Sequence, residues 1–353
     1  MDFRFTAEQL EFRDSVANFL AKECTAEHLR KLLKTDSRRS PERWKGLADL
    51  GLTGFFLPES LGGLGLTEVD FVLIAEACGL AALPETLVEQ AAVAIPLLTG
   101  CPATVARDET FGRFIAGKLQ IALGIPGAPY ISAADDAGLI ILADQAGQVV
   151  TGPGNKIMLT SVESIDPFRR LFKATGGATI VLADAEQGRA LWAEALERGA
   201  LFAAAQLLGL AQGMINMAVA YAKERKQFGV AIGSFQAVKH PLASAQVALE
   251  FARPAVYGAA YAVTHDIARA APSVSHAKIA AGDAALSAAK VAIQVHGAMG
   301  YTFEVDLHLW MKRAWALNGA FGDRNFHLDR VAAFALRQGA PIGAGETFSA
   351  AHV

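Results

Sequence analysis

The hydrophobic period of the chain changes twice, and this order limits the possible folds more than any other feature of the sequence. Apolar side chains recur every three or four positions over residues 6–114, which predicts helices. Short β-branched runs bounded by Gly, Pro and Asp occupy residues 118–185 and predict strands. The helical period then returns from about Ala190 to Gln338. Because a doubly wound sheet or a TIM barrel would alternate strand with helix, we exclude both and expect a mainly α, α+β fold.

Local signals predict where several elements begin and end. One helix should follow Thr6, where Gln9 completes a capping box, and another should have Pro41 in its first turn. Three glycines within residues 58–65 indicate a loop. Further helices are expected at residues 67–78 and 85–98, and strands at residues 139–142, 149–150 and 180–182. The last region should hold four long helical segments, broken near residues 229–234, Pro272 and residues 297–300.

Charge and cysteine content limit the partners and the compartment. With Lys+Arg 32 and Asp+Glu 35 the formal net charge is -3, so we do not expect nucleic acid as a partner. The three cysteines, Cys24, Cys78 and Cys101, are odd in number and form no CxxC pair, which predicts neither a disulfide framework nor a metal site. We therefore expect a reduced, cytoplasmic setting.

Residues 199–222 carry no charge and are long enough to span a bilayer. They include Gln206, Gln212 and Asn216, however, and are rich in Ala and Gly rather than in Leu, Ile and Phe. We therefore expect a buried helix of a helical bundle and no membrane span. The opening residues contain an acid and a base and no apolar run, unlike a secretory signal.

Two motifs in the last helical region carry most of the chemical information. In the first, Arg225-Lys226-Gln227-Phe228-Gly229 ends a long apolar stretch and precedes Phe235-Gln236. A guanidinium held in a fixed position can bind a pyrophosphate through paired hydrogen bonds. The basic residues can equally serve only to complement the C-terminus of a helix capped by Gly229.

The second motif is Gln294-Val295-His296-Gly297-Ala298-Met299-Gly300-Tyr301-Thr302. Gly297 and Gly300 bracket a short turn between two helices, where the absence of side chains lets backbone amides approach a phosphate or a ribose. The alternative is a helix that simply ends at glycine.

Together with the opening FTAEQLEFRDSVANFLAKE and the PESLGGLGLT loop, these motifs resemble the acyl-CoA dehydrogenase family over nearly the whole chain. The resemblance implies an N-terminal helical domain (residues 1–117), a small middle β-domain (118–189) and a C-terminal four-helix bundle (190–353). It also implies an oxidoreductase of lipid metabolism that binds FAD, dehydrogenates an acyl-CoA thioester and passes electrons to an electron-transferring flavoprotein. The cofactor-binding residues that it implies are Arg225, Gln227, Phe228, Phe235, Gln236, Gln294, Gly297 and Gly300.

The chain departs from the family at the position of the catalytic base. Many members have a Glu 27 residues after the glutamine that opens the glycine motif, and counting from Gln294 gives Phe321, which cannot accept a proton. Other members have the base at the start of the first bundle helix, near Glu197 in this chain. Glu197 lies about two residues too early, which favours an exposed Glu stabilised by the helix dipole over a catalytic base.

The middle domain departs as well. Members that hold flavin alone carry a Thr-Glu-Pro-Gly-Ala-Gly-Ser segment and a Trp-Ile-Thr-Asn strand. Here the corresponding stretches are Ala122-Leu123-Gly124-Ile125-Pro126-Gly127-Ala128 and Lys156-Ile157-Met158-Leu159-Thr160-Ser161. Only Pro126-Gly127 and Thr160 remain as candidate contacts to the flavin.

These departures favour one hypothesis over three alternatives. The chain is expected to be the shorter, base-lacking subunit of a heteromeric enzyme, in which a homologous acyl-CoA dehydrogenase chain supplies the Glu. Bacterial α2β2 enzymes that act on bulky CoA esters, such as steroid side chains, resemble this arrangement. The alternatives are a self-sufficient homo-oligomer that uses Glu197 or another carboxylate, a catalytically inactive scaffold subunit, and a flavin oxidase or monooxygenase of the same fold.

Overall fold

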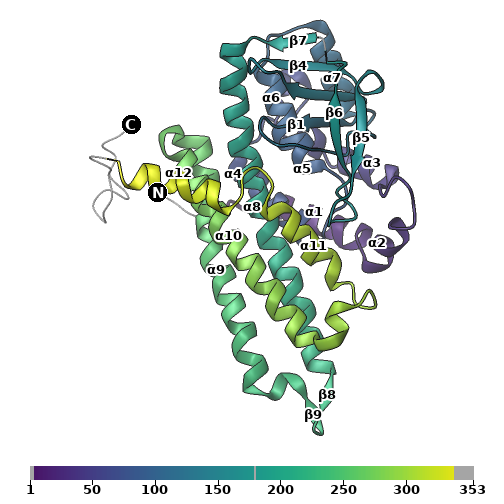
Figure 1. The fold of residues 1–353 in the computed structure, drawn as a ribbon, viewed down its shortest axis with the longest axis vertical. Coiled ribbons are helices and arrows are strands. Elements are labelled where there is room, and N and C mark those ends of the chain that lie inside the picture. Colours follow the sequence, from purple (N-terminus) through teal and green to yellow (C-terminus); the bar gives the residue numbers. More distant parts are fainter. Residues whose placement is uncertain (1–3, 179, 338–353) are drawn as a thin grey trace.

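The computed structural model describes residues 4–178 and 180–337, and its described part is a mainly helical molecule with two small sheets and a two-stranded hairpin (Figure 1). The last 16 residues of the predicted C-terminal region lie outside the described residues. The N-terminal elements are α1 (Ala7–Glu23), α2 (Ala26–Leu32), α3 (Pro41–Asp49), η1 (Leu52–Gly54), η2 (Glu59–Leu61), α4 (Glu68–Leu80), α5 (Leu87–Glu89), η3 (Gln90–Ala94), α6 (Ile95–Gly100) and α7 (Val105–Ile115).

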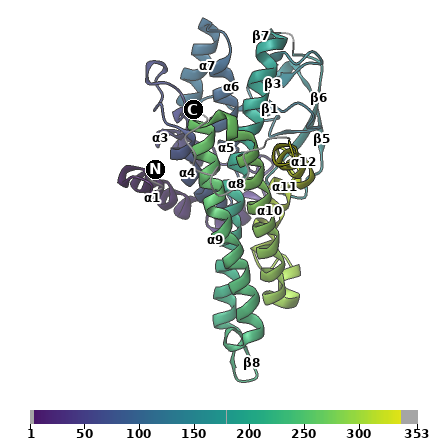
Figure 2. The same cartoon turned by 90° about the vertical axis from the view of Figure 1, so that its left-hand side faces the viewer.

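Seven strands follow, in two sheets that lie beside the first half of the next helix, α8 (Ala185–Glu224) (Figure 2). They are β1 (Ile121–Gly124), β2 (Ile131–Ser132), β3 (Leu139–Ala143), β4 (Val149–Pro153), β5 (Met158–Val162), β6 (Leu171–Thr175) and β7 (Ile180–Ala183), with η4 (Gly154–Lys156) between β4 and β5. The larger sheet has the order β1-β3-β4-β7 and the smaller one the order β2-β6-β5. β1 pairs with β3 in parallel, and the other pairs in both sheets are antiparallel.

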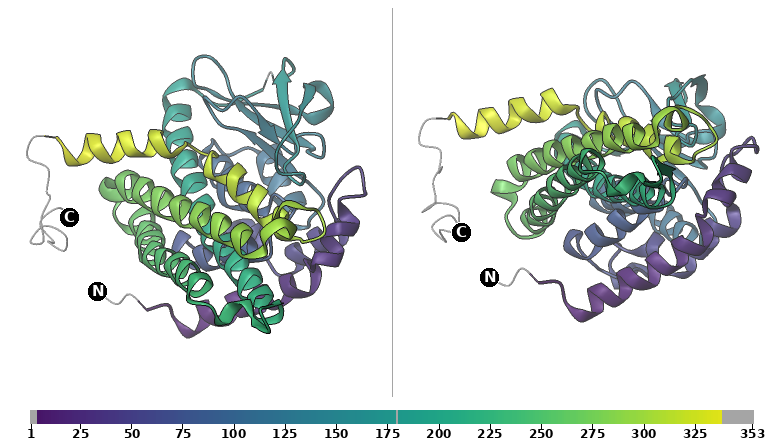
Figure 3. Two further views of the ribbon diagram at one scale, coloured as in Figure 1. Left: turned by 60° about the horizontal axis from the view of Figure 1, so that its bottom comes forward. Right: turned by 90° about the horizontal axis from the view of Figure 1, so that it is seen from below.

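The C-terminal region is a bundle of long helices with a hairpin at one end. After α8 come the hairpin strands β8 (Lys226–Gln227) and β9 (Val230–Ala231), then η5 (Ile232–Ser234), α9 (Gln236–His265), α10 (Ile267–His296), η6 (Gly297–Tyr301), α11 (Leu307–Asn318) and α12 (Arg324–Ala335). α8 packs against α4, α9, α10 and α11. Seen from below, α1 and α12 lie on opposite sides of this bundle, and α12 extends away from it (Figure 3).

The uncharged stretch of α8 is the centre of the hydrophobic core. By length and composition α8 could cross a membrane, but 78% of its most apolar 18-residue stretch is buried inside the fold. α8 also passes very close to α4: a Cβ on Gly79 would lie 2.0 Å from the carbonyl oxygen of Gln206, and one on Gly209 would lie 2.0 Å from that of Glu76. Two glycines therefore allow the backbones of α4 and α8 to touch, and the expectation of a buried helix is confirmed.

Most of the predicted elements are confirmed. In the capping box, the backbone N–H of Gln9 donates to Oγ1 of Thr6 at 3.2 Å, and the N–H of Thr6 donates to the Gln9 side chain at 2.8 Å. Pro41 is the first residue of α3, and strands occur at 139–143, 149–153 and 180–183.

Four details of the C-terminal region differ from the prediction. The break expected at Pro272 lies at Asp266, and Pro272 is inside α10, near its start. The described residues form five helices there, because the turn at residues 319–323 separates α11 from α12. α8 starts at Ala185, within the predicted middle domain. Gly229 does not cap a helix: with φ of 80° it forms, with Phe228, the turn between β8 and β9.

Candidate functional site

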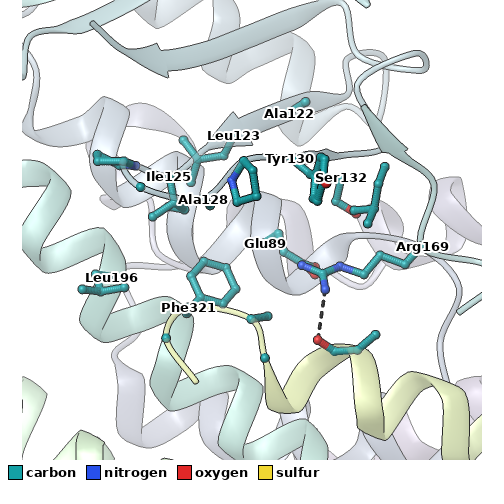
Figure 4. Close-up of a pocket in the computed structure, with 18 of the residues that line it drawn as sticks. Glu89, Ala122, Leu123, Ile125, Ala128, Tyr130, Ser132, Arg169, Leu196 and Phe321 are labelled. Carbon is teal, nitrogen blue, oxygen red and sulfur yellow. Dashed lines mark hydrogen bonds between the residues drawn. The ribbon is translucent and has the colours of Figure 1, made fainter. Parts of the chain in front are cut away.

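A cavity of about 680 Å³ lies where the sheets meet the start of the bundle (Figure 4). Its walls come from five places: α5, the segment from β1 to β2, the residues that lead into β6, α8, and the end of α11 with the turn that follows it. The volume is in the range of sites that enclose small molecules. Its apolar walls include Ile121, Leu123, Ile125, Pro126, Ala128, Leu171, Leu196 and Phe321.

Phe321 occupies the wall formed by the α11–α12 turn, and its ring points into the cavity (Figure 4). The residue has a positive φ of 55° and is followed by Gly322 with φ of 95°. The ring lies directly against α8 at Gly199, where a Cβ would lie 2.1 Å from Cδ1 of Phe321. The residue counted to the position of the family's base thus presents an apolar ring to the cavity.

The turn that carries Phe321 is held from α10 by buried polar groups. The Lys278 amine donates to the carbonyl oxygens of Asn318 at 2.8 Å and Gly322 at 3.3 Å. The His327 ring lies 3.1 Å from the carbonyl oxygen of Phe321 through Nε2 and 3.1 Å from Oγ of Ser275 through Nδ1. Because a carbonyl only accepts, Nε2 carries the proton and Nδ1 accepts from Ser275.

Burial shifts both of these ionisable groups toward their neutral forms. It lowers the pKa of Lys278 from 10.5 to about 7 and the pKa of His327 from 6.5 to about 4, and in His327 the nearby Lys278 lowers the pKa further. At neutral pH the His327 ring is therefore uncharged, and the Lys278 amine is near the midpoint of its titration.

The far end of the cavity is polar, with side chains of Glu89, Ser132 and Arg169 (Figure 4). Nη1 of Arg169 donates to the carbonyl oxygen of Ala316 at 3.1 Å. The Nε atom of Arg169 and the Oγ atom of Ser132 are buried, and within the described part of the chain neither has a hydrogen-bond partner. Burial lowers the pKa of Arg169, and the Glu89 carboxylate opposes this effect. We call these three side chains the polar end.

Glu197 lies outside the cavity lining. Its neighbour Leu196 lines the cavity, whereas the Glu197 carboxylate forms an ion pair with Arg330 of α12. The Glu197 side chain is 17% exposed. The structure therefore does not bring Glu197 together with the groups that line the cavity.

The two motifs that were predicted to bind FAD meet at the other end of the bundle. Arg225 is the C-cap of α8, and Tyr221, one turn earlier, stacks on His296 at the end of α10 with ring centroids 4.5 Å apart. This contact places Gly297 beside the last turn of α8. The residues of this cluster that are exposed are Arg225, Gln227, Phe228, Phe235, Gln236, Gln294 and Gly297.

Gly300 differs from the other residues of this cluster because it is buried, and a Cβ on it would lie 2.9 Å from the carbonyl oxygen of Ile293. This glycine is required by the packing of the turn itself. Figures 1 and 2 both show the β8–β9 hairpin at the end of the bundle farthest from the sheets. Within one chain, the cluster and the cavity are separate sites.

Sequence reasoning found some of the cavity and missed its polar end. Pro126 and Gly127 line the cavity, while Thr160 is exposed on β5 and is not part of the lining. One feature of the sequence could have indicated Glu89 as a site residue. It is the only charged residue in the otherwise largely apolar stretch LVEQAAVAIPLL. Among the described residues there is no group of three or more His, Cys, Asp or Glu side chains arranged to hold a metal ion.

Comparison with known proteins gives matches over most of the chain. Residues 6–102 match the N-terminal domain of acyl-CoA dehydrogenases, and residues 186–336 match their C-terminal domain. The chain is 31% identical over 325 residues to acyl-CoA dehydrogenase IpdE2 of Mycolicibacterium smegmatis, a match that covers 91% of this chain and 96% of that protein.

Two solved structures have the same fold. A chain of the ChsE4-ChsE5 complex from Mycobacterium tuberculosis matches with a TM-score of 0.85 and 22% identity, covering 96% of this chain and 100% of that one. The FAD complex of PigA matches with a TM-score of 0.82 and 19% identity, covering 94% of this chain and 98% of that one.

Proposed function

The chain belongs to the acyl-CoA dehydrogenase family, and from this premise we propose that it is one subunit of a heteromeric, FAD-dependent acyl-CoA dehydrogenase. In this arrangement a homologous chain supplies the catalytic Glu and the flavin contacts of the middle domain. The present chain supplies the end of the bundle that carries Arg225 and Gly297. The ChsE4-ChsE5 complex, which shares the fold, is a complex of two differently named chains.

The side chains at the end of the bundle fit one half of a dinucleotide. Arg225, Gln227, Gln236 and Gln294 are exposed donors, and Gly297 offers backbone without a side chain in open space. A guanidinium with neighbouring amides suits a pyrophosphate. In the middle domain, by contrast, the cavity wall from Ile125 to Ala128 has no side-chain hydrogen-bond donor. The chain is therefore suited to hold the dinucleotide of a neighbouring subunit.

Bound FAD would supply the acceptor for the hydride that leaves the β-carbon of the acyl group. The protein must supply orientation of the thioester and a base for the α-proton. Phe321 supplies an apolar wall and cannot take the proton. The single observation that carries the proposal is the Phe321 ring at this place in the cavity, packed against Gly199.

Co-expression tests whether the two subunits supply different parts of the active site. The chain is produced alone and together with the homologous acyl-CoA dehydrogenase chain encoded nearest to it, and flavin content and dehydrogenation of CoA esters are measured for each. We expect substantial flavin and turnover only for the pair. Full flavin occupancy and turnover by the chain alone would contradict the proposal.

A second candidate, a self-sufficient homo-oligomer, is favoured by the position of Glu89. The carboxylates that line the cavity are those of Glu89 and Asp323, and Asp323 already caps α12 by accepting from the N–H of Phe326 at 2.8 Å. If Glu89 were the base, Glu89→Gln would abolish turnover by the chain alone while flavin binding persisted. Glu197→Gln is the matched control, because the Glu197 carboxylate is paired with Arg330 outside the cavity.

The electron acceptor and the location are part of the same proposal. An electron-transferring flavoprotein is the acceptor that family membership supports. Cys24, Cys78 and Cys101 are free and buried, which is compatible with a cytoplasmic protein.

A further inference from the structure

We propose that the polar end, made of Glu89, Ser132 and Arg169, binds a hydroxyl or keto oxygen carried by the acyl group of a CoA thioester. The inference rests on the proposed function only in taking acyl-CoA thioesters as the ligands. It adds a ligand class for the cavity of this chain, namely acyl groups that are apolar near the thioester and oxygenated at a distance from it.

The first argument is that two polar atoms at this end lack partners. Nε of Arg169 and Oγ of Ser132 are buried without a hydrogen bond to any described residue. A buried donor without a partner carries a substantial desolvation penalty, so such atoms usually have a partner in the functional state. Both atoms belong to side chains of the cavity wall, and each has almost no accessible surface, so a rotation of the side chain must accompany its contact with a molecule inside the cavity.

The second argument concerns charge. Arg169 faces the Glu89 carboxylate across the polar end, while the nearby Asp166 is occupied by an ion pair with Arg313. The cation and the anion at the polar end offset each other, so a ligand carboxylate would meet Glu89 as a like charge. A neutral oxygen avoids this repulsion. A ketone accepts from Arg169 and Ser132, and a hydroxyl can in addition donate to Glu89.

The third argument is the shape of the cavity. Most of the remaining wall is apolar and suits a hydrocarbon chain or ring. Behind the polar end lies a hollow of only about 10 Å³, so a ligand cannot extend much further in that direction. The oxygen of the acyl group is thus bound at the closed end of an otherwise apolar site.

Calorimetric titration of the full chain, co-expressed with its homologous subunit where assembly requires it, tests the inference. The probes are hexanoyl-CoA, 5-oxohexanoyl-CoA, 5-hydroxyhexanoyl-CoA and adipoyl-CoA. We expect the oxo and hydroxy thioesters to bind about tenfold to a hundredfold more tightly than hexanoyl-CoA, because each gains hydrogen bonds to charged groups. Adipoyl-CoA should bind no more tightly than the oxo compound.

Variants made only in this chain assign the effect to the polar end. Arg169→Met should abolish the preference for the oxygenated thioesters. Ser132→Ala removes a single hydroxyl and should reduce this preference. Because this change is small, it still tests the inference if Arg169→Met fails to fold. Arg113→Met, which replaces an exposed arginine on α7, is the matched control and should keep the preference.

The outcomes separate the two proposals. Equal affinities for hexanoyl-CoA and 5-oxohexanoyl-CoA would overturn the inference and leave the proposed function standing. Displacement of the oxo thioester by lumiflavin would also overturn it, because the polar end would then serve the flavin ring. Absence of binding by all four thioesters would overturn both.

Discussion

At the scale of single residues, the contact between Phe321 and Gly199 decides what the cavity can do. The ring occupies a wall where a carboxylate would be needed, and it fits only because α8 has no side chain at Gly199. Two residues more than a hundred positions apart in the sequence are therefore dependent on each other.

This dependence predicts opposite effects for one substitution in two backgrounds. Gly199→Ala places a methyl group 2.1 Å from the Phe321 ring and should destabilise the chain by about 1–3 kcal/mol. In a Phe321→Ala background the space is free, and the same change should stabilise the chain by about 0.5–1 kcal/mol because alanine favours the helix. Urea unfolding of the four proteins in this cycle measures both values. Equal effects in the two backgrounds would show that the contact carries no energy.

The sequence predicted Phe321 at the base position by counting from Gln294, because that count runs along one local stretch of the chain. The polar end could not be found in this way. Glu89, Ser132 and Arg169 come from three separate segments, and only the packing of those segments places them in one cavity. Local motifs thus predicted that the base is absent from its usual position, whereas the polar end depends on tertiary contacts.

At the scale of elements, the turn between α11 and α12 depends on the buried amine of Lys278. The folded protein keeps this amine at a pKa of about 7, compared with 10.5 for an ordinary lysine. Between these two pH values the unfolded chain binds a proton that the folded chain has lost. The free energy of unfolding contributed by this residue therefore rises with pH across that window.

Lys278→Met should remove this pH dependence. Above pH 7 the free energy of unfolding of the wild type should rise relative to that of the variant. We expect a slope of up to about 1.4 kcal/mol per pH unit. Urea unfolding of both proteins at several pH values between 7 and 10 measures it. Lys290→Met, on an exposed position of the same helix, is the control and should follow the wild type. Parallel profiles for wild type and Lys278→Met would refute the assignment.

The elements themselves were largely predictable, since the change from helical to strand period and back is a property of local sequence. The differences have physical reasons. Pro272 removes one backbone hydrogen bond of α10 without ending the helix, as Pro254 does inside α9. The domain boundary predicted after residue 189 falls inside α8, and we propose that the middle domain ends at Asp184, the N-cap of that helix.

At the scale of the whole molecule, the chain presents apolar side chains at the end of the bundle farthest from the sheets. Phe228 is 93% exposed at the tip of the hairpin, and Tyr301 and Phe303 follow the turn after α10 with similar exposure. Exposed aromatic clusters of this kind mark interaction surfaces. The residues that we propose to hold the dinucleotide lie among these side chains, so we propose that a neighbouring subunit covers this end of the bundle.

This arrangement predicts that Arg225 affects the cofactor and not the fold. Because Arg225 is exposed, Arg225→Met should leave thermal unfolding of the free chain unchanged. In the complex with the homologous chain, loss of charge-assisted hydrogen bonds to a pyrophosphate should weaken FAD binding by about tenfold to a hundredfold, as measured by fluorescence titration. Lys226→Met is the control for loss of one positive charge at the same tip. If both variants weaken FAD binding equally, Arg225 acts only through its positive charge and not through specific hydrogen bonds. If neither variant weakens FAD binding, this end of the bundle does not hold the dinucleotide.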